Sequence, residues 1–167
     1  FRARLKELAM LMVFEATRDL TTRPVLIRTP LAAHEGSALA RPLIVAPILR
    51  AGLGLLTGML EMLADVSVAH IGIFRNEDTH RPESYYFKAP AHLADAEVIL
   101  VDPMLATGWS ATAAVARLKE AGAQTIRFVC LVACPEGLRQ LREAHPDVRI
   151  FTAAIDEGLN DRSYIVP

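Results

Sequence analysis

The chain has only two cysteines, Cys130 and Cys134, among its 167 residues. So few cysteines exclude a disulfide-rich framework. A zinc site would need further cysteines or histidines at suitable spacing, and the sequence shows none beside this pair. Both thiols follow or end an apolar run, which favours burial. We therefore interpret them as free thiols and expect a cytoplasmic protein.

The chain also lacks an excess of charge of either sign, with 18 basic residues, 19 acidic residues and a formal net charge of −1. This balance gives no electrostatic reason to expect a nucleic-acid or membrane partner. No apolar run has the length of a membrane span. Residues 1–4 lead directly into an amphipathic helical pattern, so no signal peptide is expected. Hydrophobic residues make up 52% of the chain, which excludes disorder and favours one globular domain over residues 1–167.

Apolar runs alternate with helical patterns along most of the chain. This alternation predicts an α/β fold with three layers, in which helices cover both faces of a mostly parallel, twisted sheet. A polar segment at 31–40 is predicted to be a loop or edge hairpin, and 75–90 a flap or hairpin over the site. The cluster at 85–87 is interpreted as core or interface. Strands are expected at 43–49, 66–74, 97–101, 125–133 and 148–155, and helices from the start to about 19, at 52–63, at 110–121 and from 135.

The most informative stretch is 99–111, which reads Ile-Leu-Val-Asp-Pro-Met-Leu-Ala-Thr-Gly-Trp-Ser-Ala. An apolar strand ends at Asp102, small residues follow, and Ser110 is expected to cap a helix. Amide groups at a helix start attract anions, whereas a carboxylate just before them repels phosphate unless it serves other groups of the ligand. Ribose hydroxyls or Mg²⁺ would suit it, so the pattern suggests a sugar phosphate. An ordinary strand-to-helix turn is the alternative that these residues leave open.

Two arginines stand at the ends of other predicted strands. Arg50 follows the run at 43–49, and Arg75 follows the run at 66–74. Ligands of parallel sheets bind at the carboxyl ends of the strands, so both are expected near Asp102. Guanidinium groups make paired hydrogen bonds with phosphates. The three segments together therefore predict a ligand with more than one phosphate.

These segments resemble the uracil phosphoribosyltransferase family, a branch of the type I phosphoribosyltransferases. The pair Asp102-Pro103 is the most specific feature, because most phosphoribosyltransferases carry two acidic residues there. The matching segments are 47–54 (Pro-Ile-Leu-Arg-Ala-Gly-Leu-Gly), 75–77 (Arg-Asn-Glu), 101–108, 133–137 (Ala-Cys-Pro-Glu-Gly), 145–147 (His-Pro-Asp), 155–160 (Ile-Asp-Glu-Gly-Leu-Asn) and 164–167 (Tyr-Ile-Val-Pro).

The resemblance implies transfer of a phosphoribosyl group from 5-phosphoribosyl 1-diphosphate (PRPP) to uracil, giving UMP and diphosphate. It implies Mg²⁺ held mainly through PRPP, a homo-oligomer such as a dimer or tetramer, and GTP as an activator in some members. Arg50, Arg75 and Asp102 would serve the reaction, and Ile165 would contact uracil. The PRPP-binding residues would be those three together with Pro103, Met104, Leu105, Ala106, Thr107, Gly108, Trp109 and Ser110.

The sequence departs from the family pattern at two places. Trp109 stands where a second glycine is usual, so a positive φ there would be strained, whereas an indole directed to solvent would leave phosphate binding intact. The family's N-terminal arm and its base-binding segment after residue 167 are not in this sequence. Inactivity of residues 1–167 alone therefore stays open. Two alternatives also remain: a regulator that senses PRPP or a nucleotide on the same fold, and a phosphoribosyltransferase for another base.

Overall fold

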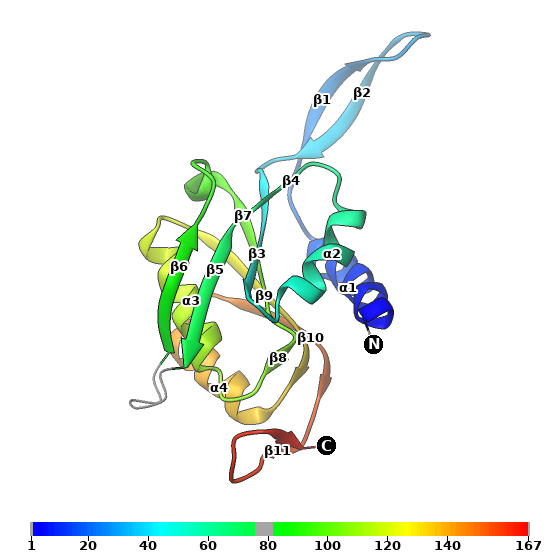
Figure 1. Cartoon of the computed structure of the whole chain (residues 1–167). Helices are drawn as coiled ribbons and strands as arrows, with labels where there is room; N and C mark the ends of the chain where they lie inside the picture. Colours follow the sequence, from blue (N-terminus) through cyan, green and yellow to red (C-terminus); the bar gives the residue numbers. More distant parts are fainter. Residues whose placement is uncertain (1, 76–81, 167) are drawn as a thin grey trace.

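The structure is a computed structural model that describes residues 2–75 and 82–166. Its centre is a twisted sheet in the strand order β10-β9-β7-β3-β5-β6 (Figure 1), in which every pair is parallel except β5 with β6. The short strands β4 and β8 add to β3 and β9. The strands are β3 (Leu43–Leu49), β4 (Val66–Val68), β5 (His70–Arg75), β6 (Pro82–Lys88), β7 (Glu97–Val101), β8 (Met104–Leu105), β9 (Thr125–Ala133) and β10 (Arg149–Ile155).

Helices cover both faces of this sheet, which confirms the predicted three layers. One hydrophobic cluster joins helices α1 and α2 to the sheet, and a second cluster joins α3 and α4 to the opposite face. A short 3₁₀ helix, η1 (Leu93–Asp95), precedes β7. None of the helices within the described ranges is both long and apolar enough to cross a bilayer. The helices are α1 (Arg2–Thr17), α2 (Leu53–Met62), α3 (Trp109–Glu120) and α4 (Pro135–Ala144).

The predicted strands are found because their apolar runs are covered on both sides. Residues 43–48 of β3 are all buried, and β7 and β9 are nearly as well covered. The boundaries predicted for β3, β7 and β9 are confirmed. The run at 66–74 forms two strands, β4 and β5, which pair with successive parts of β3. Helix α1 ends at Thr17, two residues before the expected boundary at 19.

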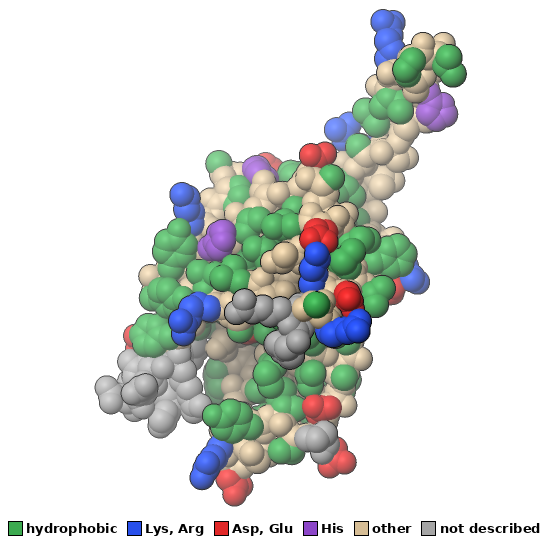
Figure 2. Space-filling view, turned by 45° about the vertical axis from the view of Figure 1, so that its right-hand side comes forward, with side chains coloured by type: hydrophobic (Ala, Val, Ile, Leu, Met, Phe, Trp, Pro, Cys, Tyr) green, Lys and Arg blue, Asp and Glu red, His purple; other side chains and the backbone are tan. Residues whose placement is uncertain are grey.

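A hairpin of β1 (Thr22–Arg28) and β2 (Ala33–Leu39) projects from the body at the end of the sheet opposite β11 (Gly158–Leu159) (Figure 1). The polar segment at 31–40 is therefore half of a separate two-stranded arm. Figure 2 shows this arm standing clear of the body with hydrophobic side chains on its surface. Leu26 is 77% exposed and Leu31 is 98% exposed. Exposure of such side chains on a projecting arm is typical of a contact surface.

The segment predicted to be a flap divides into two parts. Residues 76–81 lie outside the described residues. Strand β6 pairs antiparallel with β5 at the edge of the main sheet, which agrees with the hairpin alternative for 75–90 and not with a loose flap. The guanidinium of Arg117 lies 4.1 Å from the centre of the Phe87 ring, and this contact holds the edge strand on α3.

An ionic cluster secures α1 to the sheet at the amino-terminal ends of its strands. Arg127, at the start of β9, is buried, and its guanidinium donates to the carbonyl of Ala16 at 3.0 Å. Asp19 accepts hydrogen bonds from both Arg127 and Arg149. These two guanidinium groups lower the pKa of Asp19 to about 2. The cluster lies at the end of the sheet opposite the carboxyl edge described next.

Candidate active site

The loops that follow β3 and β7 meet at the carboxyl edge of the sheet, as predicted for Arg50 and Asp102. The N–H of Gly52 donates to Ile48 at 2.8 Å, which turns the chain sharply after β3. The backbone N–H of Asp102 donates to the carbonyl of Val129 in β9 at 3.1 Å, which fixes the backbone of Asp102 at the end of β7. The central position of these strands in the sheet therefore brings the two charged residues to one edge.

The turn before α3 is made by glycine. Gly108 has φ of 82° and is the residue that precedes the helix, which begins at Trp109. Ser110 lies inside the first turn and no side chain caps the helix, so the expected Ser110 cap is wrong. The first helical hydrogen bond runs from Thr112 to Gly108 at 2.9 Å. The N–H groups before Thr112 therefore lack helical acceptors and are available to an anion.

Trp109 takes an ordinary helical conformation. Among the non-glycine residues that the structure describes, only Ser163 has a positive φ. Trp109 is therefore free of the backbone strain that a positive φ would cause. The side chain is 53% exposed and lines a shallow depression of about 300 Å³ with Arg139 and Glu143 of α4. The indole therefore does not occupy the turn at Gly108. The departure from the family pattern therefore causes no backbone strain at the start of α3.

The underside of residues 105–108, here called the phosphate loop, packs on the start of α4. The Leu105 side chain is buried in the core below the loop, so any contact of this residue with a ligand is through its backbone. The thiol of Cys134 donates to the carbonyl of Ala106 at 3.0 Å. A Cβ at Gly137 would lie 2.4 Å from the same oxygen. Sequence reasoning gave Cys134 and Gly137 no role, although both belong to the matching segment 133–137.

Among the titratable groups that the structure describes, Asp102 has the largest shift in pKa. Burial raises its pKa to about 7, and it also raises the pKa of the neighbouring Cys130 thiol to about 11. A carboxylate shifted in this way gains most from a cation or from hydroxyl donors that favour its ionised form. In the described chain no cluster of three or more His, Cys, Asp or Glu forms a metal site. One protein carboxylate fits Mg²⁺ only if substrate oxygens supply the other ligands.

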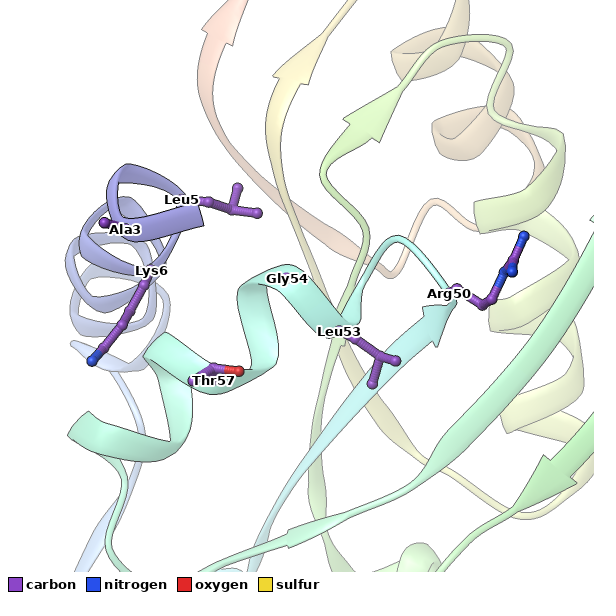
Figure 3. Close-up of a pocket in the computed structure, with 7 residues that line it drawn as sticks. All are labelled: Ala3, Leu5, Lys6, Arg50, Leu53, Gly54 and Thr57. Carbon is purple, nitrogen blue, oxygen red and sulfur yellow. The ribbon is translucent and has the colours of Figure 1, made fainter. Parts of the chain in front are cut away.

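Arg50 lines two cavities. A cavity of about 550 Å³ is lined by Arg50 together with Phe74 and Tyr85, whose ring centres lie 6.1 Å apart. Tyr85 is exposed and forms part of a cavity wall, so it does not belong to the core, and an interface role for the cluster at 85–87 stays a prediction. A second cavity of about 580 Å³ lies between α1 and α2, and Figure 3 shows the Arg50 side chain extending away from α1. The first cavity is the better ligand site, because it opens at the carboxyl edge of the sheet.

The other residues predicted for the site are Arg75, Pro103, Met104 and Ile165. Arg75 is the last residue of β5, as expected, and its side chain lies outside the described part of the structure. The carbonyl of Pro103 accepts from Leu131 at 3.0 Å, and the Met104 side chain is exposed. Ile165 lies in β12 (Ile165–Val166), which pairs with β11 (Gly158–Leu159). The surface is hollowed just above the lowest part of the molecule, where β11 lies (Figures 1 and 2).

The fold is that of the type I phosphoribosyltransferases. The chain is similar to a purine phosphoribosyltransferase from Pyrococcus horikoshii, with a TM-score of 0.61, 17% identity, and coverage of 96% of this chain and 85% of that one. It is similar also to a protein from Aquifex aeolicus, with a TM-score of 0.93, 36% identity, and coverage of 99% and 80%. The low identity to the purine enzyme shows a shared fold alone.

The sequence comparisons define the family. The model of the uracil phosphoribosyltransferase family matches residues 1–167. Uracil phosphoribosyltransferases from Brucella anthropi and Agrobacterium fabrum are 52% and 54% identical to the chain. Both alignments include the whole chain, and they cover 81% and 80% of the two relatives. The chain belongs to the uracil phosphoribosyltransferase family. Its class is therefore that of enzymes that use PRPP and a nucleobase, as the resemblance predicted.

Proposed function

We propose that the protein transfers the 5-phosphoribosyl group of PRPP to uracil, giving UMP and diphosphate in pyrimidine salvage. One observation carries the proposal: the half-buried Asp102 and the Gly108 turn lie at one edge of the sheet in a chain that belongs to this family. The turn suits a phosphate, and the carboxylate suits the ribose hydroxyls. This assignment of roles explains why an acidic group stands beside an anion site.

The reaction needs little covalent chemistry from the protein. A bond forms between N1 of uracil and C1 of the ribose, the bond from C1 to the diphosphate oxygen breaks, and N1 loses its proton. Positive charge develops on the ribose and negative charge on the leaving diphosphate. Arg50 would stabilise the diphosphate, while Asp102 would orient the ribose and the loop at Gly108 would hold its 5′-phosphate. Arg75 is assigned to PRPP by the resemblance.

The proposal includes Mg²⁺. Bound through diphosphate and ribose oxygens, it would neutralise charge on the leaving group. Asp102 would interact with the ion or with the hydroxyls that hold it. Support comes from its burial, which makes a neighbouring cation favourable, and from the preference of Mg²⁺ for oxygen ligands.

The proposal also includes a homo-oligomer in the cytoplasm. Support for association comes from the projecting arm with Leu26 and Leu31 exposed, since such side chains gain from burial against a second copy. The two free thiols, Cys130 and Cys134, favour a reducing compartment. GTP activation remains an expectation from the resemblance.

An assay of diphosphate release tests the function. The protein is supplied with PRPP, Mg²⁺ and, in separate reactions, uracil, adenine, hypoxanthine or guanine. Release with uracil alone is the expected result. Release with a purine and none with uracil would contradict the substrate assignment. PRPP binding without release with any base, together with RNA binding at physiological salt, would favour the regulator.

A further inference from the structure

The start of α4 contacts two segments of the candidate site at once. Cys134 precedes the helix and touches the phosphate loop, whereas Glu136, in the first turn, touches β11. These two residues belong to the segment 133–137, which matched the family without receiving a role. Strand β11 pairs with β12, and β12 contains Ile165, the residue that the resemblance assigns to uracil.

Two hydrogen bonds join Cys134, which is buried, to the phosphate loop. The N–H of Cys134 donates to Leu105 at 3.2 Å, and its thiol donates to Ala106 at 3.0 Å. Burial raises the pKa of this thiol, so it keeps its hydrogen at neutral pH. The close approach of Gly137 to the Ala106 oxygen leaves no room for the loop to move toward α4. The phosphate loop and the start of α4 therefore form one rigid unit.

The contact to β11 is made by the Glu136 carboxylate. Its own N–H, the Cys134 thiol and the backbone of Leu159 are its polar neighbours, and together they lower its pKa. A Cβ at Gly158 would lie 3.1 Å from Oε1 of Glu136, so strand and carboxylate are in close contact. Leu159 is the register partner of Ile165. The contact with β11, where Glu136 and Leu159 line the same depression, and one strand pair therefore connect Glu136 to the expected base-binding residue.

We infer that Glu136 is a positioning residue that holds β11 and β12, and with them Ile165, at a fixed distance from the phosphate loop. The base and the 5′-phosphate of one nucleotide are bonded to the same ribose, so their two binding elements must keep a matching separation. A link through the start of α4 sets that separation before the ligand binds, which lowers the cost of binding. The inference rests on the proposed function and on the resemblance, which assigns Ile165 to uracil.

Two ligands separate this role from a general structural one. UMP reaches both elements, whereas ribose 5-phosphate reaches the phosphate loop but has no base. Calorimetric titrations of both ligands are made with the wild type, Glu136→Gln and Glu136→Ala. Glu143→Ala is the control, because Glu143 is an exposed carboxylate on the same helix and lines the same depression.

We expect Glu136→Ala to weaken UMP binding about tenfold, the size of a lost hydrogen bond to a charged group, and to leave ribose 5-phosphate binding within about twofold. Glu136→Gln keeps one acceptor oxygen, so its loss of affinity for UMP is intermediate between the wild type and Glu136→Ala. Glu143→Ala matches the wild type with both ligands. Unchanged binding of ribose 5-phosphate also shows that each variant is folded around the loop.

Equal losses for the two ligands, or no loss for UMP in Glu136→Ala, would overturn the inference. Failure of the proposed function looks different. A wild type that binds a purine monophosphate and not UMP contradicts the uracil assignment. If Glu136→Ala then weakens binding of that purine nucleotide and leaves binding of ribose 5-phosphate unchanged, the positioning role stands. A wild type that binds none of these ligands contradicts both.

Discussion

A Cβ atom on Gly52 would lie 2.6 Å from the carbonyl oxygen of Val101. The loop after β3 therefore rests directly on the end of β7, one residue before Asp102. Atoms of Ile48 lie almost as close, at 2.8 and 2.9 Å, and all three neighbours belong to the backbone. The relative positions of Arg50 and Asp102 thus depend on a contact that only glycine allows.

Substitution of this glycine is expected to separate the two charged residues. Gly52→Ala forces backbone against backbone, so we expect a loss of roughly 1–3 kcal/mol in unfolding free energy and about tenfold weaker PRPP binding. Gly36→Ala in the arm is the control, because its Cβ would meet only the end of the Ile27 side chain at 3.4 Å. Chemical denaturation and calorimetry measure the two effects. PRPP binding as tight as in the wild type would contradict the assigned contact.

Asp102→Asn is expected to stabilise the fold while removing function. The pKa of Asp102 rises from 3.8 to about 7 on folding, so the folded protein retains a proton that the unfolded chain releases. The associated stability is full below about pH 4 and is lost as the pH rises through 7. The neutral amide avoids that loss, so the variant should gain roughly 1–3 kcal/mol at pH 8 and little at pH 4.

Thermal unfolding at several pH values, together with PRPP titration, tests this expectation. The variant should melt higher than the wild type at pH 8 and bind PRPP much more weakly. A variant that melts lower at pH 8 would show that the carboxylate has a structural partner instead.

Gly108→Ala is expected to impair the phosphate loop for two reasons. The residue has φ of 82°, and a Cβ there would lie 2.9 Å from both the carbonyl oxygen of Gly137 and Cβ of Gln140. Gly122→Ala is a matched control, because φ is 104° but the nearest atom would be 3.7 Å away. We expect about 1 kcal/mol of destabilisation from backbone strain in the control, and more in Gly108→Ala. Only Gly108→Ala should lose affinity for ribose 5-phosphate.

The ionic cluster around Asp19 should affect stability without affecting binding. Its pKa is lowered to about 2, so its contribution is present above about pH 4 and is lost as the pH falls toward 2. Asp19→Asn should therefore melt below the wild type at pH 7, and the two should converge near pH 2. Asp65→Asn, also exposed and at the same end of the sheet, is the control. A change in UMP affinity in Asp19→Asn would contradict the separation of this cluster from the site.

The arm offers a test of association. Leu26→Asp places a charge on a side chain that is 77% exposed, so it should not harm the folded monomer. If the arm contacts a second copy, the variant should sediment as a smaller species than the wild type while keeping its melting behaviour at low concentration. Glu35→Gln, on the other strand of the arm, serves as the control. Unchanged sedimentation of an oligomeric wild type would place the interface elsewhere.

Much of this fold could be predicted because its strands are buried on both faces. Continuous apolar runs such as 43–49 and 125–133 have few alternatives, and the helices between them require parallel pairing. The same pattern placed Arg50 and Asp102 at strand ends, where parallel topology brings them to one edge. The backbone conformation at Trp109 was beyond prediction, since it depends on where α3 begins. Ser110 was assigned the cap, but Gly108 makes the turn.

The sequence by itself determined which strands and helices follow one another along the chain, the family, and the identity of the residues at the strand ends. These follow from short-range hydrophobic patterns and from residue types, which are visible along a chain. Only the tertiary structure decided that Cys134 supports the phosphate loop, that Glu136 holds Leu159, and that Tyr85 forms a cavity wall. Such contacts join residues far apart in sequence, and packing between whole elements sets their distances, so no local pattern records them.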